Sequence, residues 1–157
     1  MATAVPPAEE NGPARAAEYF RSARAAADRG RYRAAIELYL EGLRRDPDDV
    51  EAHRELRQIA LRRRAVGGKR AGIFRQIRLR RRTPSPLANL LHAEELLAYD
   101  PANIEWMVAA ARHAAEARLE ETAVWLREEC RKATTTNGDK PGADHIQPTT
   151  GDEGAGR

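Results

Sequence analysis

The stretch AAIELYLEGLRRDPDDVEAH, residues 34–53, decides the fold expected of this chain. Its apolar residues recur at helical spacing until Asp46-Pro47, and the residue before a proline is pushed out of the helical region. The stretch therefore predicts the end of one helical hairpin and the start of the next. A second stretch, NLLHAEELLAYDPANIEWM at residues 89–107, follows the same plan 54 positions later. Two copies of one helical unit indicate a helical repeat.

Composition supports an all-α fold. The chain has 157 residues, of which 41% are hydrophobic, 32% charged and only 5% aromatic. This length suits one domain, and cores rich in Ala and Leu suit closely packed helices. The apolar runs are far shorter than the ~20 residues of a membrane span, and the N-terminus lacks the pattern of a signal peptide. We therefore expect a cytoplasmic protein without a membrane span, whose single cysteine, Cys130, is an ordinary thiol on a helix face.

Both ends of the chain predict disorder. Residues 1–13 and 133–157 are rich in Pro, Gly or Thr and poor in large apolar side chains, so they cannot offset the entropy of ordering. Between them, residues 14–132 predict a short solenoid of about three antiparallel helical hairpins. The expected helices lie at about 14–29, from 32 to the Asp46-Pro47 stop, and at 50–66, 86–98, 102–116 and 119–132. A basic insertion at about 65–86 interrupts the middle hairpin.

At residue level the hairpins resemble the tetratricopeptide repeat. The first carries Tyr19, Ser22, Ala23, Ala26, Ala35, Tyr39 and Pro47 at that family's spacing, and the third carries Met107, Ala110, Ala111, Ala114 and Ala123. Small residues such as Ala23 and Ala35 are expected where two helices cross closely. The middle repeat departs from the family at Arg57 and Asn89, where small residues are expected. The chain is thus similar to a small bacterial-type protein of this family with an insertion in its middle repeat.

The resemblance implies a peptide-binding groove lined by the first helix of each hairpin. The residues that it places along the groove are Phe20, Arg24, Arg54, Gln58, Arg62, Val108 and Arg112. Four arginines in one trough favour an acidic segment or a C-terminal carboxylate, because guanidinium groups bind carboxylates in a bidentate manner.

The insertion lies within a strongly basic block. From Arg54 to Arg82 there are twelve basic residues and one acid, a local net charge of +11 in a chain of net charge +3. Such a block either binds an anionic polymer or pairs with acidic surface of the same chain. The candidate acids are Asp46, Asp48, Asp49, Glu51, Glu94, Glu95, Glu116, Glu120 and Glu121. The basic patch at its centre comprises Arg70, Arg75, Arg78, Arg80, Arg81 and Arg82.

Ile73, Phe74 and Ile77, with Leu79, form an apolar edge within this patch. Four interpretations remain open for the segment 69–82. The edge docks a helix onto the repeat core, the patch contacts RNA, DNA or an acidic ribosome-like partner, the segment lies on a membrane surface, or it is disordered. The single aromatic residue, Phe74, argues against sequence-specific binding of single strands.

Catalysis finds little support in the sequence. His53, His92, His113 and His145 are scattered, and His53 and His113 fall on apolar steps typical of core or groove-edge positions. Gly67-Gly68-Lys69 lacks the rest of a phosphate loop and predicts a break between helices. We expect no catalytic residues, no metal site and no cofactor. The leading hypothesis is a non-catalytic adaptor or scaffold that binds a protein or peptide partner, and the alternative is a nucleic-acid- or ribosome-associated protein that uses the arginine-rich segment 54–82.

Overall fold

A computed structural model describes residues 12–138, so the disorder predicted for residues 1–11 and 139–157 lies outside the described residues. Within residues 12–138 every regular element is a helix, which confirms the all-α prediction. The helices are α1 (Gly12–Asp28), α2 (Tyr32–Leu43), α3 (Val50–Ala65), α4 (Ile73–Arg80), α5 (Pro86–Tyr99), α6 (Ile104–Glu116) and α7 (Glu120–Gly138).

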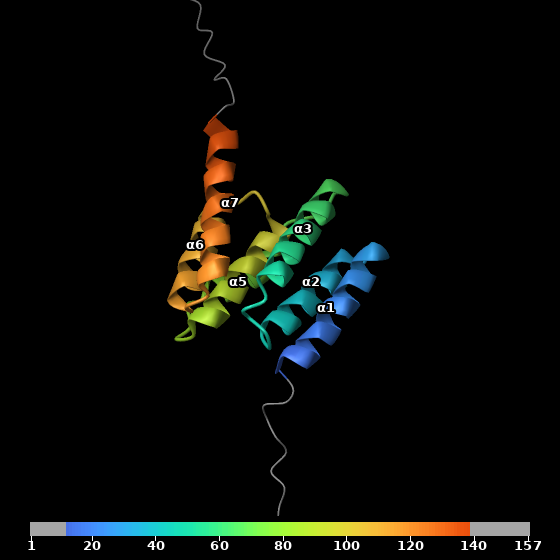
Figure 1. The fold of residues 1–157 in the computed structure, drawn as a ribbon. Helices are drawn as coiled ribbons and strands as arrows, with labels where there is room; N and C mark the ends of the chain where they lie inside the picture. The colour runs from blue at the N-terminus through green and yellow to red at the C-terminus, as the bar shows by residue number, and fades with distance from the viewer. Residues whose placement is uncertain (1–11, 139–157) are drawn as a thin grey trace, which may run out of the picture.

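Except for α3 and α4, helices that follow one another in the chain pack against one another. α1, α2 and α3 lie side by side, and α5, α6 and α7 form the other half of the molecule (Figure 1). α1 packs against α2, α6 packs against α7, and α3 packs against α5 across the insertion. The beginning of α1 and the end of α7 lie at opposite ends of the molecule (Figure 1).

The turns of the outer hairpins have the same backbone form. Gly30 in the first has φ 72°, and Arg118 in the third has φ 61°. These residues are 88 positions apart, like the crossing residues Ala35 and Ala123, which are both buried. Glycine adopts this left-handed conformation without strain, whereas arginine does not. The turns of the two hairpins therefore share one backbone geometry, which Gly30 adopts without strain and Arg118 does not.

Among residues 12–138, three helices begin with a side-chain cap. Asp49, Ser85 and Asn103 each accept a hydrogen bond from the backbone N–H three residues later, at 3.0–3.2 Å. Such caps satisfy amides that have no partner within the helix. Asp49 and Asn103 are 54 positions apart, the spacing of the two sequence copies, so the repeat extends to the start of α3 and α6.

Two hydrophobic cores meet at α5. One face of this helix joins the core of α1, α2 and α3 through Leu91, Ala98 and Tyr99. Another face joins the core of α6 and α7 through Leu90, Ala93 and Leu97. A helix that is apolar on several sides is typical of a buried position. α5 is therefore the element shared by the two halves.

Both predicted boundaries with the tails need correction. Gly12 and Pro13, expected to be disordered, belong to α1, and α7 continues through residues 133–138 instead of ending at 132. The hydroxyl groups of Thr134, Thr135 and Thr136 donate to backbone carbonyls three or four residues earlier, at 2.8–3.2 Å. These local bonds allow threonines to continue a helix that buries little apolar surface.

The insertion forms a helix, α4, but most of the apolar edge that one of the four interpretations docks onto the core lies outside. Ile73, Phe74 and Ile77 are 63%, 85% and 51% exposed, and only Leu79 of this edge is buried. α4 instead contacts the body through arginines that lie over aromatic rings: Arg75 over Tyr99 at 4.9 Å, and Arg80 over Trp106 at 5.1 Å. A guanidinium plane can stack on an aromatic ring, so the basic face of α4 packs against the body of the protein and its apolar edge faces outward.

Candidate functional site

The seven residues predicted to line a single groove occupy separate places. Phe20 is buried in the first core, where its ring stacks on Tyr39 with the centroids 6.1 Å apart. A Cβ atom on Gly42 would clash with the Phe20 ring, so this glycine makes room for it. Phe20 therefore belongs to the core and not to a binding surface.

Arg24, Gln58 and Arg62 do lie together, in a hollow between α1 and α3. The guanidinium of Arg24 is already engaged, because its Nε donates to the Glu55 carboxylate at 3.0 and 3.1 Å. The Tyr39 hydroxyl donates to the same carboxylate at 2.8 Å. The hydrogen bond to Glu55 raises the pKa of Arg24 in spite of partial burial. Because Arg24 is already paired with Glu55, this hollow does not present the cluster of arginines that was predicted to bind an acidic ligand.

The other three predicted groove residues lie elsewhere. Arg54 faces α7, Val108 is exposed on α6, and Arg112 lines a hollow beside α4. Arg54 lies 3.6 Å from Glu51, and Arg112 lies 4.0 Å from Glu116. The physical reason is the placement of the third hairpin, which brings its second helix, α7, against α3. The predicted trough of first helices is thus interrupted.

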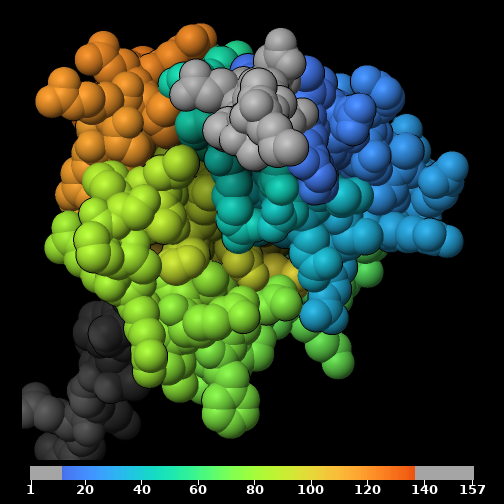
Figure 2. All heavy atoms as spheres, turned by 90° about the horizontal axis from the view of Figure 1, so that it is seen from below, coloured from blue at the N-terminus to red at the C-terminus, as the bar shows by residue number. Residues whose placement is uncertain are grey.

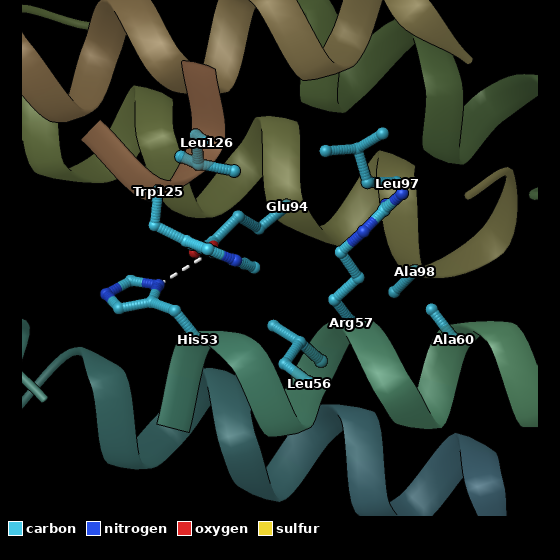
Figure 3. Close-up of a pocket in the computed structure, with 9 residues that line it drawn as sticks. All are labelled: His53, Leu56, Arg57, Ala60, Glu94, Leu97, Ala98, Trp125 and Leu126. Carbon is cyan, nitrogen blue, oxygen red and sulfur yellow. Dashed lines mark hydrogen bonds and ion pairs between the residues drawn. The ribbon is translucent and has the colours of Figure 1, made fainter. Parts of the chain in front are cut away.

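A different groove lies where α7 meets α3 over α5 (Figure 3). Its inner end is a small pocket of about 20 Å³, which has room for about one water molecule. The floor is mainly apolar, and Trp125 contributes from α7. The lining residues are His53, Leu56, Arg57, Ala60, Glu94, Leu97, Ala98, Trp125 and Leu126.

A buried polar pair lies at the inner end of this groove. His53 Nδ1 is 2.7 Å from Glu94 Oε1, and His53 Nε2 is 2.9 Å from the Pro47 carbonyl oxygen. A carbonyl oxygen only accepts, so Nε2 carries a proton and Nδ1 faces the carboxylate. Burial alone lowers the pKa of His53, but the charge and hydrogen bond of Glu94 outweigh it and raise the pKa above its ordinary value. The pair ties α3 to α5 (Figure 3).

A second polar bridge joins α3 to α7. Arg57 Nε donates to Glu129 Oε2 at 2.9 Å, and Arg57 also donates to the Pro101 carbonyl oxygen at 3.2 Å. Lys132 donates to the other oxygen of Glu129 at 3.1 Å. Burial raises the pKa of Glu129, but the bonds from Lys132 and Arg57 outweigh it, so the pKa falls below its ordinary value. Arg57, a departure from the repeat pattern, thus holds the two halves together.

The outer part of the groove is an open hollow of about 450 Å³. Trp125 lines both this hollow and the inner pocket, and Val124, beside it, is 62% exposed. The rim is mixed in charge, with three carboxylates and two cations: Arg54, Glu121, Glu128, Glu129 and Lys132. We define the inner pocket and this hollow together as the α3–α7 groove.

Sequence reasoning found Arg54 but missed the other principal residues of this groove. Trp125 and Glu129 lie in the helix predicted at 119–132, and neither was predicted to have a role. One signal was present in the sequence, since Arg57 replaces a small residue of the repeat pattern. Cys130 itself is partly buried, and burial raises the pKa of its thiol, consistent with the expected unreactive side chain.

Half of the basic block is paired with acids of the same chain. Six of its twelve basic residues lie within 4.0 Å of a carboxylate. The pairs are Arg54–Glu51, Arg57–Glu129, Arg70–Asp100, Arg75–Glu95, Arg78–Glu95 and Arg82–Glu116. Three of these acids were among the predicted partners, whereas Asp100 and Glu129 were not. Of the six residues of the basic patch, Arg80 lies over Trp106 and Arg81 is exposed.

Residues 12–138 contain no group of three His, Cys, Asp or Glu side chains arranged to hold a metal ion. None of the helices in that range is long and apolar enough to cross a bilayer. His53 and His113 are buried, as their apolar steps indicated, and His113 Nδ1 lies 2.9 Å from Glu116. Comparison with family models, curated proteins and solved structures found no match to this chain.

Proposed function

We propose that this chain is a non-catalytic interaction module, related in plan to the tetratricopeptide repeat, that binds a peptide segment of another protein in the α3–α7 groove. The observation that carries the proposal is a partly exposed tryptophan, Trp125, beside an apolar floor. Large aromatic side chains in partly enclosed sites supply much of the affinity of protein interfaces. The groove does contain a His–carboxylate pair, but both ring nitrogens of His53 are engaged, by Glu94 and by the Pro47 carbonyl oxygen, so neither is free to act on a substrate.

The form of the groove suggests the chemistry of its ligand. An apolar side chain of the partner fits beside Trp125 and Val124, and polar groups on either side meet the mixed rim. Because Glu121, Glu128 and Glu129 outnumber Arg54 and Lys132, the rim gives no preference for the acidic segment expected from the sequence. The partner segment is therefore apolar at its centre, with charges of both signs around it.

The nucleic-acid alternative receives less support from the same geometry. Half of the basic block is engaged by carboxylates, which reduces the positive charge available to phosphates. Phe74 is the only aromatic residue in the segment 54–82, so the segment offers few rings on which bases could stack.

A cytoplasmic location is part of the proposal, because a chain with one cysteine forms no internal disulfide.

The test compares partner capture by four immobilised chains: the wild type, Trp125→Ala, Val124→Ser and a control, Val108→Ser. Val108 is also exposed but lies on α6, away from the groove. Truncation of a central aromatic anchor is expected to cost about 2 kcal/mol or more of binding free energy. A protein retained by the wild type and the control, but lost from both groove variants, supports the proposal. Equal retention by all four chains contradicts it.

A direct readout comes from the tryptophans, of which the chain has two. In a Trp106→Phe background, Trp125 is the only tryptophan, so its fluorescence reports on the groove. Addition of the captured partner is expected to shift the emission of Trp125 to shorter wavelength, because binding removes the ring from water. An unchanged spectrum at saturating partner would place the contact elsewhere.

A further inference from the structure

The outer edge of α4 is an apolar surface without a partner in the described structure. Ile73, Phe74 and Ile77 recur at helical spacing, and each is more than half exposed. α4 and its flanking segments form the lower edge of the molecule in the view of Figure 2. Neighbouring exposed apolar side chains are characteristic of interaction sites. None of these three side chains lines a hollow described above, so this edge protrudes.

The edge is held outward by contacts on the opposite side of the helix. Leu79 is buried, and Arg75 lies over Tyr99 and 3.6 Å from Glu95. Gln76 donates to the Ala71 carbonyl oxygen at 2.7 Å, which fixes the segment leading into the helix. The exposure of the three apolar side chains therefore results from how α4 is anchored and not from a frayed end.

Positive charge surrounds the edge. There is no Asp or Glu in the sequence between Glu55 and Glu94, and eleven of the residues in that interval are Arg or Lys. Lys69 and Arg81 flank α4 and are exposed, with no carboxylate within 4.0 Å among the described residues. Arg70 and Arg78 pair with acids but keep 68% of their side-chain surface exposed. Cations thus lie at both ends of the apolar edge.

We propose that α4 docks the protein onto an anionic lipid surface. In this arrangement Ile73, Phe74 and Ile77 enter the boundary between headgroups and acyl chains, while Lys69 and Arg81 contact lipid phosphates. A short basic helix with a protruding apolar edge suits a soft phase, which needs no preformed groove. Nucleic acid would use the cations but not the isoleucine side chains, which cannot stack on bases. The site is separate from the α3–α7 groove and does not depend on its function.

The test is co-sedimentation of the full chain with vesicles of phosphatidylcholine alone, or of phosphatidylcholine mixed with phosphatidylglycerol. The wild type is expected to bind the mixed vesicles roughly tenfold more tightly, and added salt should weaken the binding. The edge variant Ile73→Ser/Phe74→Ser/Ile77→Ser should lose roughly tenfold in affinity, because it removes the buried apolar groups. The charge variant Lys69→Gln/Arg81→Gln should lose several-fold.

The matched control is Val108→Ser/Val124→Ser, which removes exposed apolar side chains from α6 and α7 and should bind vesicles as the wild type does. The depth to which residue 74 enters the bilayer is tested with Phe74→Trp in a background without Trp106 and Trp125. The fluorescence of the new tryptophan should be quenched by lipids with brominated acyl chains.

Three outcomes would overturn the proposal. The first is a wild type that does not bind mixed vesicles, and the second is an edge variant that binds them as the wild type does. The third is a wild-type dimer, seen by sedimentation, that the edge variant abolishes while vesicle binding is unaffected. That last result would assign the edge to a second copy of the chain. If the charge variant retains RNA as well as the wild type does, Lys69 and Arg81 are not an RNA site. That result would support their assignment to the lipid surface.

Discussion

The α1–α2 hairpin and the α3–α5 pair bring two helices together by different means. In the first, Ala23 and Ala35 are fully buried at the crossing, and a turn of three residues joins the helices. In the second, the chain between the helices is twenty residues long and contains α4. The first pair is thus specified by small residues and a tight turn, as in the third hairpin.

Polar contacts replace these features in the middle pair. His53 and Glu94 join α3 to α5, and Arg57 extends the connection to α7. Asn89 accepts from the Thr83 backbone amide and donates to the Thr83 carbonyl oxygen, at 2.8 and 2.9 Å, which fixes the end of the insertion. The comparison shows that adjacent helices are held by apolar packing and a tight turn, whereas the helices separated by the insertion add polar bridges to their apolar contacts.

Removing half of the buried pair should have the largest effect. We expect Glu94→Leu to lower the free energy of unfolding by about 3–5 kcal/mol, because His53 then stays buried without its partner. The measurement is urea unfolding followed by circular dichroism. The double variant His53→Leu/Glu94→Leu should recover most of the loss. Effects of the two substitutions that simply add would mean that the pair does not hold the middle helices.

Overpacking the first hairpin should cost less. Ala35→Leu is expected to destabilise the protein by about 1–3 kcal/mol, since the crossing with α1 has no room for a larger side chain. Ala34→Leu is the control, because Ala34 is exposed on the same helix. Ala123→Leu should behave like Ala35→Leu if the third hairpin follows the same plan. An unchanged thermal midpoint for Ala35→Leu would contradict this account of the crossing.

The middle pair should also make stability depend on pH. The pKa of His53 is raised in the folded protein, so the stability that it contributes is full below its unfolded pKa, about 6.5. That contribution is lost as pH rises through the folded value. His92 acts in the opposite direction, because burial lowers its pKa. Unfolding curves over a pH series should therefore be compared with the His53→Leu/Glu94→Leu variant, in which the alkaline loss should be smaller.

The smallest effect concerns the two outer turns. Arg118→Gly should stabilise the protein by about 0.5–1 kcal/mol, because glycine relieves the left-handed backbone conformation. Gly30→Ala should destabilise it by a similar amount, although no atom lies within 4 Å of the new Cβ. Thermal melts of both variants test the equivalence of the turns. Opposite signs are expected, and equal signs would show that the turns are not equivalent.

The helices could be predicted because local sequence patterns mark where they end. Asp46-Pro47 and Gly30 mark helix ends by backbone sterics, so the helices and the two tight hairpins were accessible from the sequence. The end of α7 was not, because threonines that bond to their own helix lack an apolar signal. The outward edge of α4 was also missed, since the periodicity of Ile73, Phe74 and Ile77 cannot show which face meets the body.

The candidate site was less predictable because it depends on how the hairpins are placed. The groove inferred from the family needs the first helices side by side, whereas α7 lies against α3 in this structure. Arg57 and Glu129 are 72 positions apart, and no local pattern joins them. The acidic partners of the basic block were partly anticipated, because a charge of +11 in a chain of +3 requires compensation elsewhere.

Because α5 lies between two hydrophobic cores, it stays protected when part of the protein unfolds. Backbone amides in the centre of α5 are covered from both sides, by Leu91 with the first core and Leu90 with the second. Partial opening of either outer hairpin leaves the other core in place over this helix. Hydrogen exchange in the centre of α5 should therefore require unfolding of the whole domain, whereas amides near the start of α1 and in the last turns of α7 should exchange through smaller openings.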